Sequence, residues 1–302
     1  MENNQSALIN KKNAVWIGIS GLALTFFLYQ IIGSSLAFLI FGFDIINAPK
    51  INFKLFTIAS HLLFILAPAL YLLKFYFKDP NFILNFRRLQ FIEILALTFG
   101  FGIVYFVSQF YAACQEQLLN YFANNNPFFK AIKDAIDAIN RSLESSYVQL
   151  LKADSFFDYA ITFFLIAFLP AIGEEILFRG FSQNCFSIRL KSFSSIFLTS
   201  ILFSAFHFNL YGFIPLFLIS VLLGYAFYYS KTIAASMYIH FLNNFLSLIA
   251  YYSLGAPDTL KDTADFNFSW QANLFLLIFS LSLFVLYLRY LKEFYKRRTL
   301  NI

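Results

Sequence analysis

The chain has 302 residues, of which 60% are hydrophobic, only 13% are charged and 44 are phenylalanine. Soluble domains carry about twice this charged share, so the composition excludes a soluble globular protein. The net charge of +6 does not indicate nucleic-acid binding, because the basic residues form short clusters beside apolar runs. The sequence therefore predicts a polytopic protein of the lipid bilayer.

Eight apolar segments follow one another along the chain, and each is expected to form a transmembrane helix. They cover residues 14–41, 55–73, 91–113, 156–181, 196–208, 213–229, 232–252 and 270–288, the fifth being the shortest. Gly100 and Gly102 in the third segment are expected to allow close helix packing. We find no internal repeat, so we predict an all-α fold in which residues 1–302 form a single membrane domain of about eight helices.

The charge of the connecting segments predicts the orientation, since Lys and Arg are enriched in cytoplasmic loops. The N-terminus, the 74–90 and 182–192 connections and the tail are basic, whereas 114–155 and 254–269 lean acidic, the latter through Asp258, Asp262 and Asp265. The 42–54 connection, with Lys50 and Lys54, fits this alternation less well. Both termini are therefore predicted to lie in the cytoplasm.

The longest connection, residues 114–155, is predicted to be an extracytoplasmic loop that contains an amphipathic helix. Four apolar residues recur at helical spacing after the break that ends at Pro127, namely Ile132, Ile136, Ile139 and Leu143. This pattern is typical of a helix that lies on the membrane surface. We expect it to anchor or pack rather than to bind a ligand.

The fourth apolar segment is unusual because Glu174, Glu175 and Arg179 interrupt it near its end. Each charge inside a lipid-facing helix costs about 2.5–3.5 kcal/mol, so these residues need partners or a function. Glu175 and Arg179 are four residues apart and are expected to pair, whereas Glu174 is turned about 100° away and has no such partner. We therefore predict that Glu175 and Arg179 support a site in which Glu174 performs the chemistry. Pro170 and Gly173 are expected to loosen this helix.

Further polar residues lie in the two segments that carry His207, His240 and Asn244. At about 1.5 Å per residue, Glu174 and His240 lie level, about 12 Å from the cytoplasmic ends of their segments, and His207 lies up to one turn deeper. A single buried histidine is more often a structural hydrogen-bonding residue, so the argument depends on the similar depths. These side chains are expected to meet in an intramembrane cavity open to the cytoplasm, with Arg179 near its rim.

Three sequence motifs coincide with these residues: EEILFR at 174–179, FSAFH at 203–207 and HFLNN at 240–244. They resemble the motifs EExxxR, FxxxH and HxxxN of the CPBP family, the CAAX-prenyl-protease and bacteriocin-processing (Abi) intramembrane endopeptidases. The resemblance covers about residues 156–252, which we take as the motif-bearing catalytic core. It does not extend to the first 150 residues or to the tail.

The resemblance implies an eight-helix core with a conical cavity in which peptide bonds are cut. It assigns Glu174 as the general base, His207 as a residue that helps to activate water, and His240 with Asn244 as the residues that hold the oxyanion. Glu175 and Arg179 take supporting positions, which agrees with the pairing argument.

The family is often described as a metalloprotease, and Glu174, His207 and His240 would be a plausible zinc set. The HExxH spacing of zinc proteases is missing, however. We therefore favour a glutamate-activated water without a cofactor and keep zinc as the alternative.

The sequence leaves three functions open. The first is an intramembrane peptidase whose substrate is a membrane-associated protein or peptide. The second is a catalytically idle scaffold or bacteriocin-immunity protein of the same fold. The third is a proton-coupled transporter, which is disfavoured because the chain shows no inverted repeats. The Phe-, Asn- and Lys-rich composition and the spread of the family suggest a bacterial cytoplasmic membrane, where an endogenous prenylated CAAX protein would be an improbable substrate.

Overall fold

The computed structural model describes residues 7–42, 48–254 and 268–299. Within these ranges the chain is helical, and the only strand-like pairing is one isolated bridge between Ala7 and Phe77. The acidic residues predicted to mark the last connection, Asp258, Asp262 and Asp265, lie outside the described residues.

Three of the long helices contain π-helical turns. The first consists of α1 (Ala14–Phe26), η2 (Phe27–Gly33) and α2 (Ser34–Phe41), and the second of α3 (Lys50–His61), η4 (Leu62–Leu66) and α4 (Ala67–Tyr76). The third consists of α8 (Phe156–Phe163), η5 (Phe164–Phe168), α9 (Leu169–Glu175), η6 (Ile176–Gln183) and α10 (Asn184–Arg189). The uninterrupted helices are α5 (Pro80–Leu84), α6 (Phe91–Asn125), α7 (Pro127–Leu151), α11 (Ser192–Phe206), α12 (Phe213–Ser230), α13 (Ile233–Leu254) and α14 (Trp270–Thr299).

Seven of these helical segments, among the described residues, are long and apolar enough to cross a bilayer. They agree with seven of the eight predicted segments, so an all-α polytopic membrane protein is confirmed. The remaining predicted segment, the fifth, is α11, an apolar helix of 15 residues. It is about 22 Å long, which is short for a hydrocarbon core of about 30 Å.

The third helix is longer than the sequence suggested. We expected it to end at residue 113, but α6 continues to Asn125 without a break. It ends there because the residue before a proline avoids helical dihedral angles: Asn126 has φ −149° and ψ 120°, and its side chain caps α7. The predicted amphipathic helix is present as α7, and Ile132 and Ile139 on it are exposed. The side chain of Leu143 lies outside the described part.

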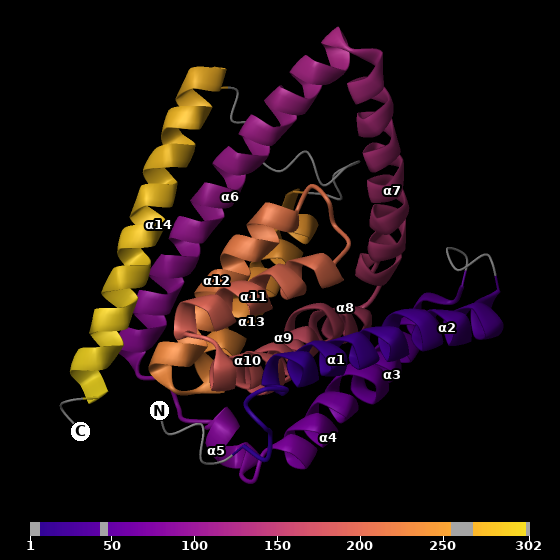
Figure 1. The fold of residues 1–302 in the computed structure, drawn as a ribbon. Helices are drawn as coiled ribbons and strands as arrows, with labels where there is room; N and C mark the ends of the chain where they lie inside the picture. Colours follow the sequence, from indigo (N-terminus) through magenta and orange to yellow (C-terminus); the bar gives the residue numbers. More distant parts are fainter. Residues whose placement is uncertain (1–6, 43–47, 255–267, 300–302) are drawn as a thin grey trace.

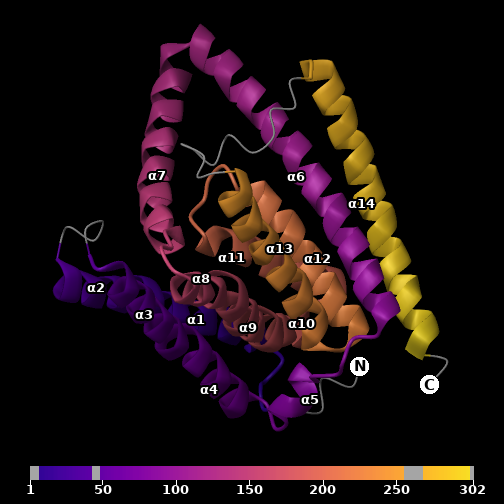
Figure 2. The same ribbon diagram turned by 180° about the vertical axis from the view of Figure 1, so that it is seen from behind.

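Figures 1 and 2 show how the helices are arranged. α14 runs along α6, and α6 also packs against α12 and α13 in the middle of the molecule. α1 and α4 form the opposite flank and contact η6 of the fourth span, while α10 packs on α1. The fourth span is therefore enclosed, which explains why it is the most buried of the seven.

The two glycines predicted to allow close packing differ. A Cβ at Gly100 would lie 2.3 Å from the Tyr287 ring, whose hydroxyl donates a hydrogen bond of 2.7 Å to the carbonyl of Ala96. Gly100 therefore makes the contact between α6 and α14 that the sequence suggested. For Gly102 the prediction was wrong, because nothing lies within 4 Å of a Cβ built there.

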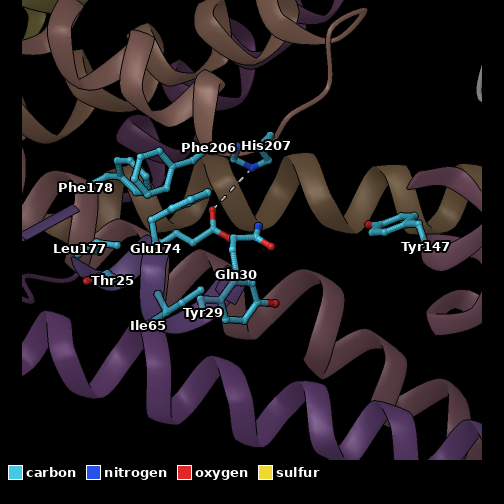
Figure 3. A pocket seen from close by; sticks show the side chains of 11 residues that line it. Thr25, Tyr29, Gln30, Ile65, Tyr147, Glu174, Leu177, Phe178, Phe206 and His207 are labelled. Carbon is cyan, nitrogen blue, oxygen red and sulfur yellow. Dashed lines mark ion pairs between the residues drawn. The ribbon is translucent and has the colours of Figure 1, made fainter. Parts of the chain in front are cut away.

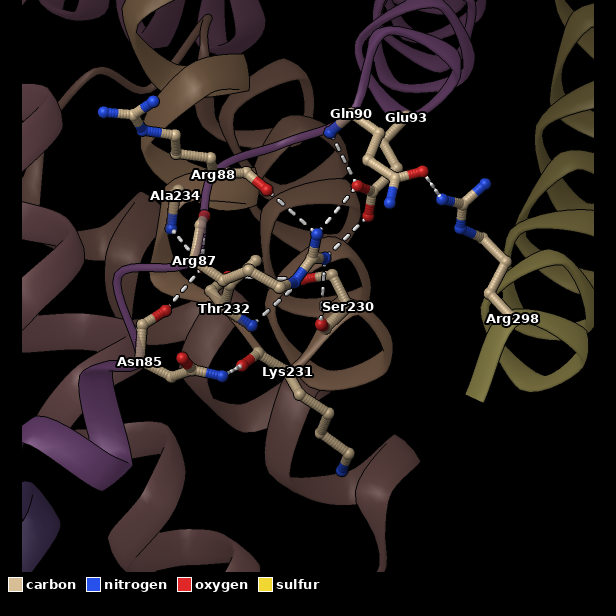
Figure 4. A network of polar contacts seen from close by, with 10 residues as sticks. All are labelled: Asn85, Arg87, Arg88, Gln90, Glu93, Ser230, Lys231, Thr232, Ala234 and Arg298. Atoms are coloured by element: carbon tan, nitrogen blue, oxygen red, sulfur yellow. Dashed lines mark hydrogen bonds and ion pairs between the residues drawn. The ribbon is translucent and has the colours of Figure 1, made fainter. Parts of the chain in front are cut away.

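A polar network joins the connection before α6 to the turn before α13 (Figure 4). Arg87 donates two hydrogen bonds, of 2.7 and 2.8 Å, to the buried carboxylate of Glu93. The side chain of Asn85 donates to the carbonyl of Lys231, and the hydroxyl of Thr232 donates to the carbonyl of Asn85, each over 2.6 Å. Arg87 therefore has a structural partner as well as the orienting role that the sequence suggested.

Replacing Arg87 with Ala is expected to destabilise the protein, because it leaves the carboxylate of Glu93 buried without its cation. Leaving a buried acceptor without its hydrogen-bond donors costs about 1–3 kcal/mol, and Arg87 itself is 38% exposed. Arg88→Ala is the matched control, since Arg88 is exposed and carries the same charge. Thermal unfolding in detergent should show a clear loss for Arg87→Ala alone, and equal midpoints for the two variants would contradict this assignment.

The lysines that fitted the charge alternation poorly are both paired with acids at the start of the fourth span, Asp154 just before α8 and Asp158 in its first turn. Lys50 pairs with Asp154 over 2.5 Å. Lys54 is fully buried, where it pairs with Asp158 and donates 2.8 Å to the hydroxyl of Thr162. These lysines are neutralised locally, so they do not contradict an orientation that is read from the remaining loops.

Candidate active site

The helix that carries the two glutamates is irregular, as Pro170 suggested. α9 has only seven residues and lies between two π-helical segments, η5 and η6, with Glu174 and Glu175 at its end. Pro170 has no N–H, so it cannot donate the regular helical hydrogen bond to the carbonyl of Ile166. The amide nitrogen of Asn244 on α13 donates to that carbonyl instead, over 3.1 Å.

Asn244 is therefore engaged with the backbone in this state. Its other amide atom, Oδ1, accepts a hydrogen bond of 3.0 Å from Asn243. The contacts of its side chain hold α13 against the fourth span, next to the predicted site. The oxyanion role of Asn244 stays a prediction.

Glu175 and Arg179 form the ion pair that their spacing predicted. Arg179 Nη1 lies 2.7 Å from Glu175 Oε1, and neither side chain is exposed. Arg179 Nη2 also donates to the hydroxyl of Ser220 over 2.7 Å, and its guanidinium carbon lies 4.7 Å from the centre of the Phe203 ring. The expectation that Arg179 lies near the rim of the cavity was wrong, because its pairing draws it fully into the protein.

Glu175 has a second partner, which the sequence did not reveal. Its Oε1 atom lies 2.8 Å from Nδ1 of His240. A carboxylate only accepts hydrogen bonds, so His240 carries a proton on Nδ1 and turns Nε2 in the other direction. That Nε2 atom lies 4.0 Å from Oε2 of Glu174.

His207 is oriented in the same way from another helix. Its Nδ1 atom lies 2.7 Å from the carbonyl of Phe203, which requires a proton on Nδ1, and its Nε2 lies 3.9 Å from Oε2 of Glu174. The two histidines are therefore equally close to Glu174, although the depth count had placed His207 up to one turn deeper. Oε2 of Glu174 is buried and has no hydrogen-bond partner in the described part of the chain.

The two gaps have the right size for a water molecule. An oxygen atom about 2.8 Å from both Glu174 Oε2 and a histidine Nε2 fits between atoms that lie about 4 Å apart. Such a water would donate one hydrogen to the carboxylate and contact an imidazole at the same time. This is the arrangement that general-base activation of water requires.

Glu174, His207 and His240 are also the residues predicted to hold zinc if the protein uses it. Ligand atoms at about 2.1 Å from one tetrahedral zinc ion lie about 3.4 Å apart, which is less than the 3.9 and 4.0 Å found here. No three His, Cys, Asp or Glu side chains among the described residues are arranged to hold a metal ion. These residues do not fit a zinc site as they stand, and we derive no step through a metal.

A cavity of about 330 Å³ opens beside Glu174 and His207 (Figure 3). Its walls are mainly apolar and aromatic, and more than half of its lining residues come from the part of the chain before the three motifs. The lining consists of Thr25, Phe26, Tyr29, Gln30, Ile65, Tyr147, Glu174, Leu177, Phe178, Phe206 and His207.

The amphipathic helix α7 closes one side of this cavity. Tyr147 on α7 faces the cavity, across from Leu177 and Phe178 in Figure 3. Asp137 on α7 accepts a hydrogen bond of 2.6 Å from Tyr211, in the loop that follows His207. α7 therefore contributes to the site, although the sequence suggested only an anchoring role.

Sequence reasoning missed the cavity wall. Tyr29 and Gln30 are adjacent polar residues inside the first apolar segment, and this interruption is a signal that could have pointed to them. Tyr147 and Ile65 carry no comparable signal, because an aromatic or aliphatic residue at helical spacing is ordinary for a membrane or interfacial helix.

Comparison with protein families gives one match. The family described as Type II CAAX prenyl endopeptidase Rce1-like matches residues 156–246. This stretch contains all three motifs, so the resemblance predicted from the sequence is confirmed over this part of the chain. A search of curated proteins and a search of solved structures each found no match.

Proposed function

We propose that this chain, which carries a type II CAAX prenyl endopeptidase-like core at residues 156–246, is an intramembrane endopeptidase that cuts a membrane-associated protein or peptide. The observation that supports this most directly is the convergence of two histidine Nε2 atoms on the unpartnered Oε2 of Glu174. The apolar cavity beside these atoms suits the side chains of a peptide that enters from the bilayer.

In the proposed reaction Glu174 takes a proton from the bound water as the water oxygen attacks the carbonyl carbon of the peptide bond. The C–N bond of the tetrahedral intermediate then breaks, and Glu174 returns the proton to the leaving amine. His207 holds the water through Nε2, since its Nδ1 proton is committed to Phe203. His240, when also protonated on Nε2, donates to the oxyanion, and the buried Glu175 carboxylate stabilises its positive charge.

Cells that produce the protein provide the test of this function. We expect the membrane proteome of cells with Glu174→Gln to accumulate at least one uncut protein or peptide that cells with the natural sequence cleave. A catalytically idle scaffold or immunity protein would give indistinguishable proteomes. That result would overturn the peptidase and favour the binding function.

The proposed reaction needs no metal, and chelation tests this. We expect EDTA or 1,10-phenanthroline to leave the hydrolysis of an accumulating substrate within about twofold of the untreated rate. The reason is that Oε2 of Glu174 lies farther from the Nε2 atom of each histidine than shared coordination of one zinc ion allows. Loss of activity that only added zinc restores would assign Glu174, His207 and His240 as metal ligands instead.

We further propose that both termini and the mouth of the cavity face the cytoplasm of a bacterial cell. The start of the described chain and the end of α14 lie at the same end of the molecule, opposite the turn between α6 and α7 (Figures 1 and 2). The connection after α10 lies at that end too, because Arg189 donates to the carbonyl of Lys12 over 3.2 Å.

Cysteine labelling in whole cells checks this orientation. In a background without Cys114 and Cys185, a membrane-impermeant maleimide should label Asn125→Cys but label Lys191→Cys only after the membrane is opened. Both positions are exposed in the structure. Labelling of both from outside, or of Lys191→Cys alone, would reject the orientation.

A further inference from the structure

The third histidine of the chain, His61, is not part of any of the three motifs. It ends α3, far before the stretch that matches the endopeptidase family. Its side chain is nonetheless buried, with only 4% of its surface exposed, and its Nε2 atom has no hydrogen-bond partner among the described residues. Leaving such an atom unpaired costs about 1–3 kcal/mol, so packing alone would be served better by an apolar side chain.

His61 lies directly against the backbone of the helix that carries Glu174. A Cβ built on Gly173 would lie 2.5 Å from Nε2 of His61, which is closer than such atoms approach in real structures. Only glycine therefore lets the imidazole approach the residue before Glu174 this closely. The sequence suggested that Gly173 loosens the helix, and the structure gives it this second role.

The other side of His61 contacts the wall of the cavity. Its ring meets the ring of Tyr29 edge-on, with the two centres 6.1 Å apart. Tyr29 lines the cavity, and so does Ile65, which lies one helical turn after His61. His61 thus lies between Tyr29 of the first span and the backbone at Gly173 of the fourth span. It is also close enough to Glu174 to interact with its charge.

We propose that His61 is a positioning residue that sets where the Glu174 carboxylate lies in the cavity. The inference rests on the proposed function and deepens it, since it gives the unmatched first half of the chain a part in the reaction. Glu174 must meet a water and a peptide carbonyl together, and a displacement of about 1 Å at such a site can cost about 100-fold in rate.

The test uses the pair His61 and Gly173 in the full-length protein. Gly173→Ala adds a methyl group that collides with His61, so we expect kcat to fall at least tenfold while KM stays within about threefold. His61→Ala should lower kcat similarly, because the carboxylate loses its support. The double variant should lose no more kcat than His61→Ala alone, since the same support is missing and the collision is gone. Gly102→Ala is the control, because nothing lies within 4 Å of its added methyl group.

A second measurement does not need turnover. Dicyclohexylcarbodiimide modifies carboxyl groups within membranes, and mass spectrometry gives its rate of reaction at Glu174. We expect Gly173→Ala to change this rate at least threefold, and the double variant to react within twofold of His61→Ala. If the natural protein hydrolyses no substrate but the variants show this labelling pattern, the proposed function fails and the positioning of Glu174 stands. If hydrolysis and labelling in His61→Ala and Gly173→Ala equal those of the natural protein, the positioning role is wrong. Losses of kcat that multiply in the double variant would equally reject it, because they would show that the two residues act independently.

Discussion

Replacing Glu174 with Gln should reduce hydrolysis at least about 1,000-fold while the protein keeps its fold. Glutamine has the size of glutamate but cannot take a proton from water, and general-base catalysis alone is worth about 100- to 10,000-fold. Oε2 of Glu174 accepts no hydrogen bond from the described residues, so little structure depends on its charge. The measurement is hydrolysis by the purified protein in nanodiscs of a peptide that accumulates in Glu174→Gln cells.

The unfolding temperature of the same variant supplies the control. We expect Glu174→Gln to unfold within a few degrees of the natural protein, since no ion pair shorter than 3.9 Å is lost. Full activity in a folded Glu174→Gln protein would rule out this residue as the base. Loss of the fold would instead show that Glu174 supports the structure.

Replacing Glu175 with Gln should cause a large loss of stability, in contrast to Glu174→Gln, which should lower activity and leave stability nearly unchanged. The charge of Arg179 would then be buried without its counter-ion, at a cost of about 3–5 kcal/mol. A loss of this size corresponds to a fall of about 5–8 °C in the unfolding temperature of a chain of 302 residues. Thermal unfolding of both variants in the same detergent provides the comparison.

Activity should also fall in Glu175→Gln, because Glu175 accepts the hydrogen bond from His240 that turns Nε2 toward Glu174. The prediction from sequence, that Glu175 mainly supports the fold, therefore needs this addition. Equal losses of stability in the Glu174 and Glu175 variants would refute the division of roles between them.

Hydropathy and spacing predicted the parts of this protein that depend on short-range rules. The helical segments follow from apolar runs of membrane length, and the Glu175–Arg179 pair follows from their separation by one helical turn. The end of α6 was misplaced because polarity marks where a helix leaves the membrane, whereas Pro127 marks where it stops.

Contacts between distant spans could not be predicted in this way. No rule of spacing links His61 to Gly173, or Asn244 to the carbonyl of Ile166, since each pair joins different helices at a particular height and rotation. Gly100 and Gly102 make the same point: they look alike in the sequence, and only one of them faces Tyr287.

The length of α6 has a practical consequence for imaging. Its 35 residues extend about 52 Å, and even with a tilt of about 40° they reach about 40 Å along the membrane normal, roughly 10 Å more than the hydrocarbon core. The sharp turn at Asn126 therefore stands clear of the lipid at the tip of a helical hairpin. A rigid protein fused there would give electron microscopy an alignment mark outside the detergent belt, at the far end from both termini.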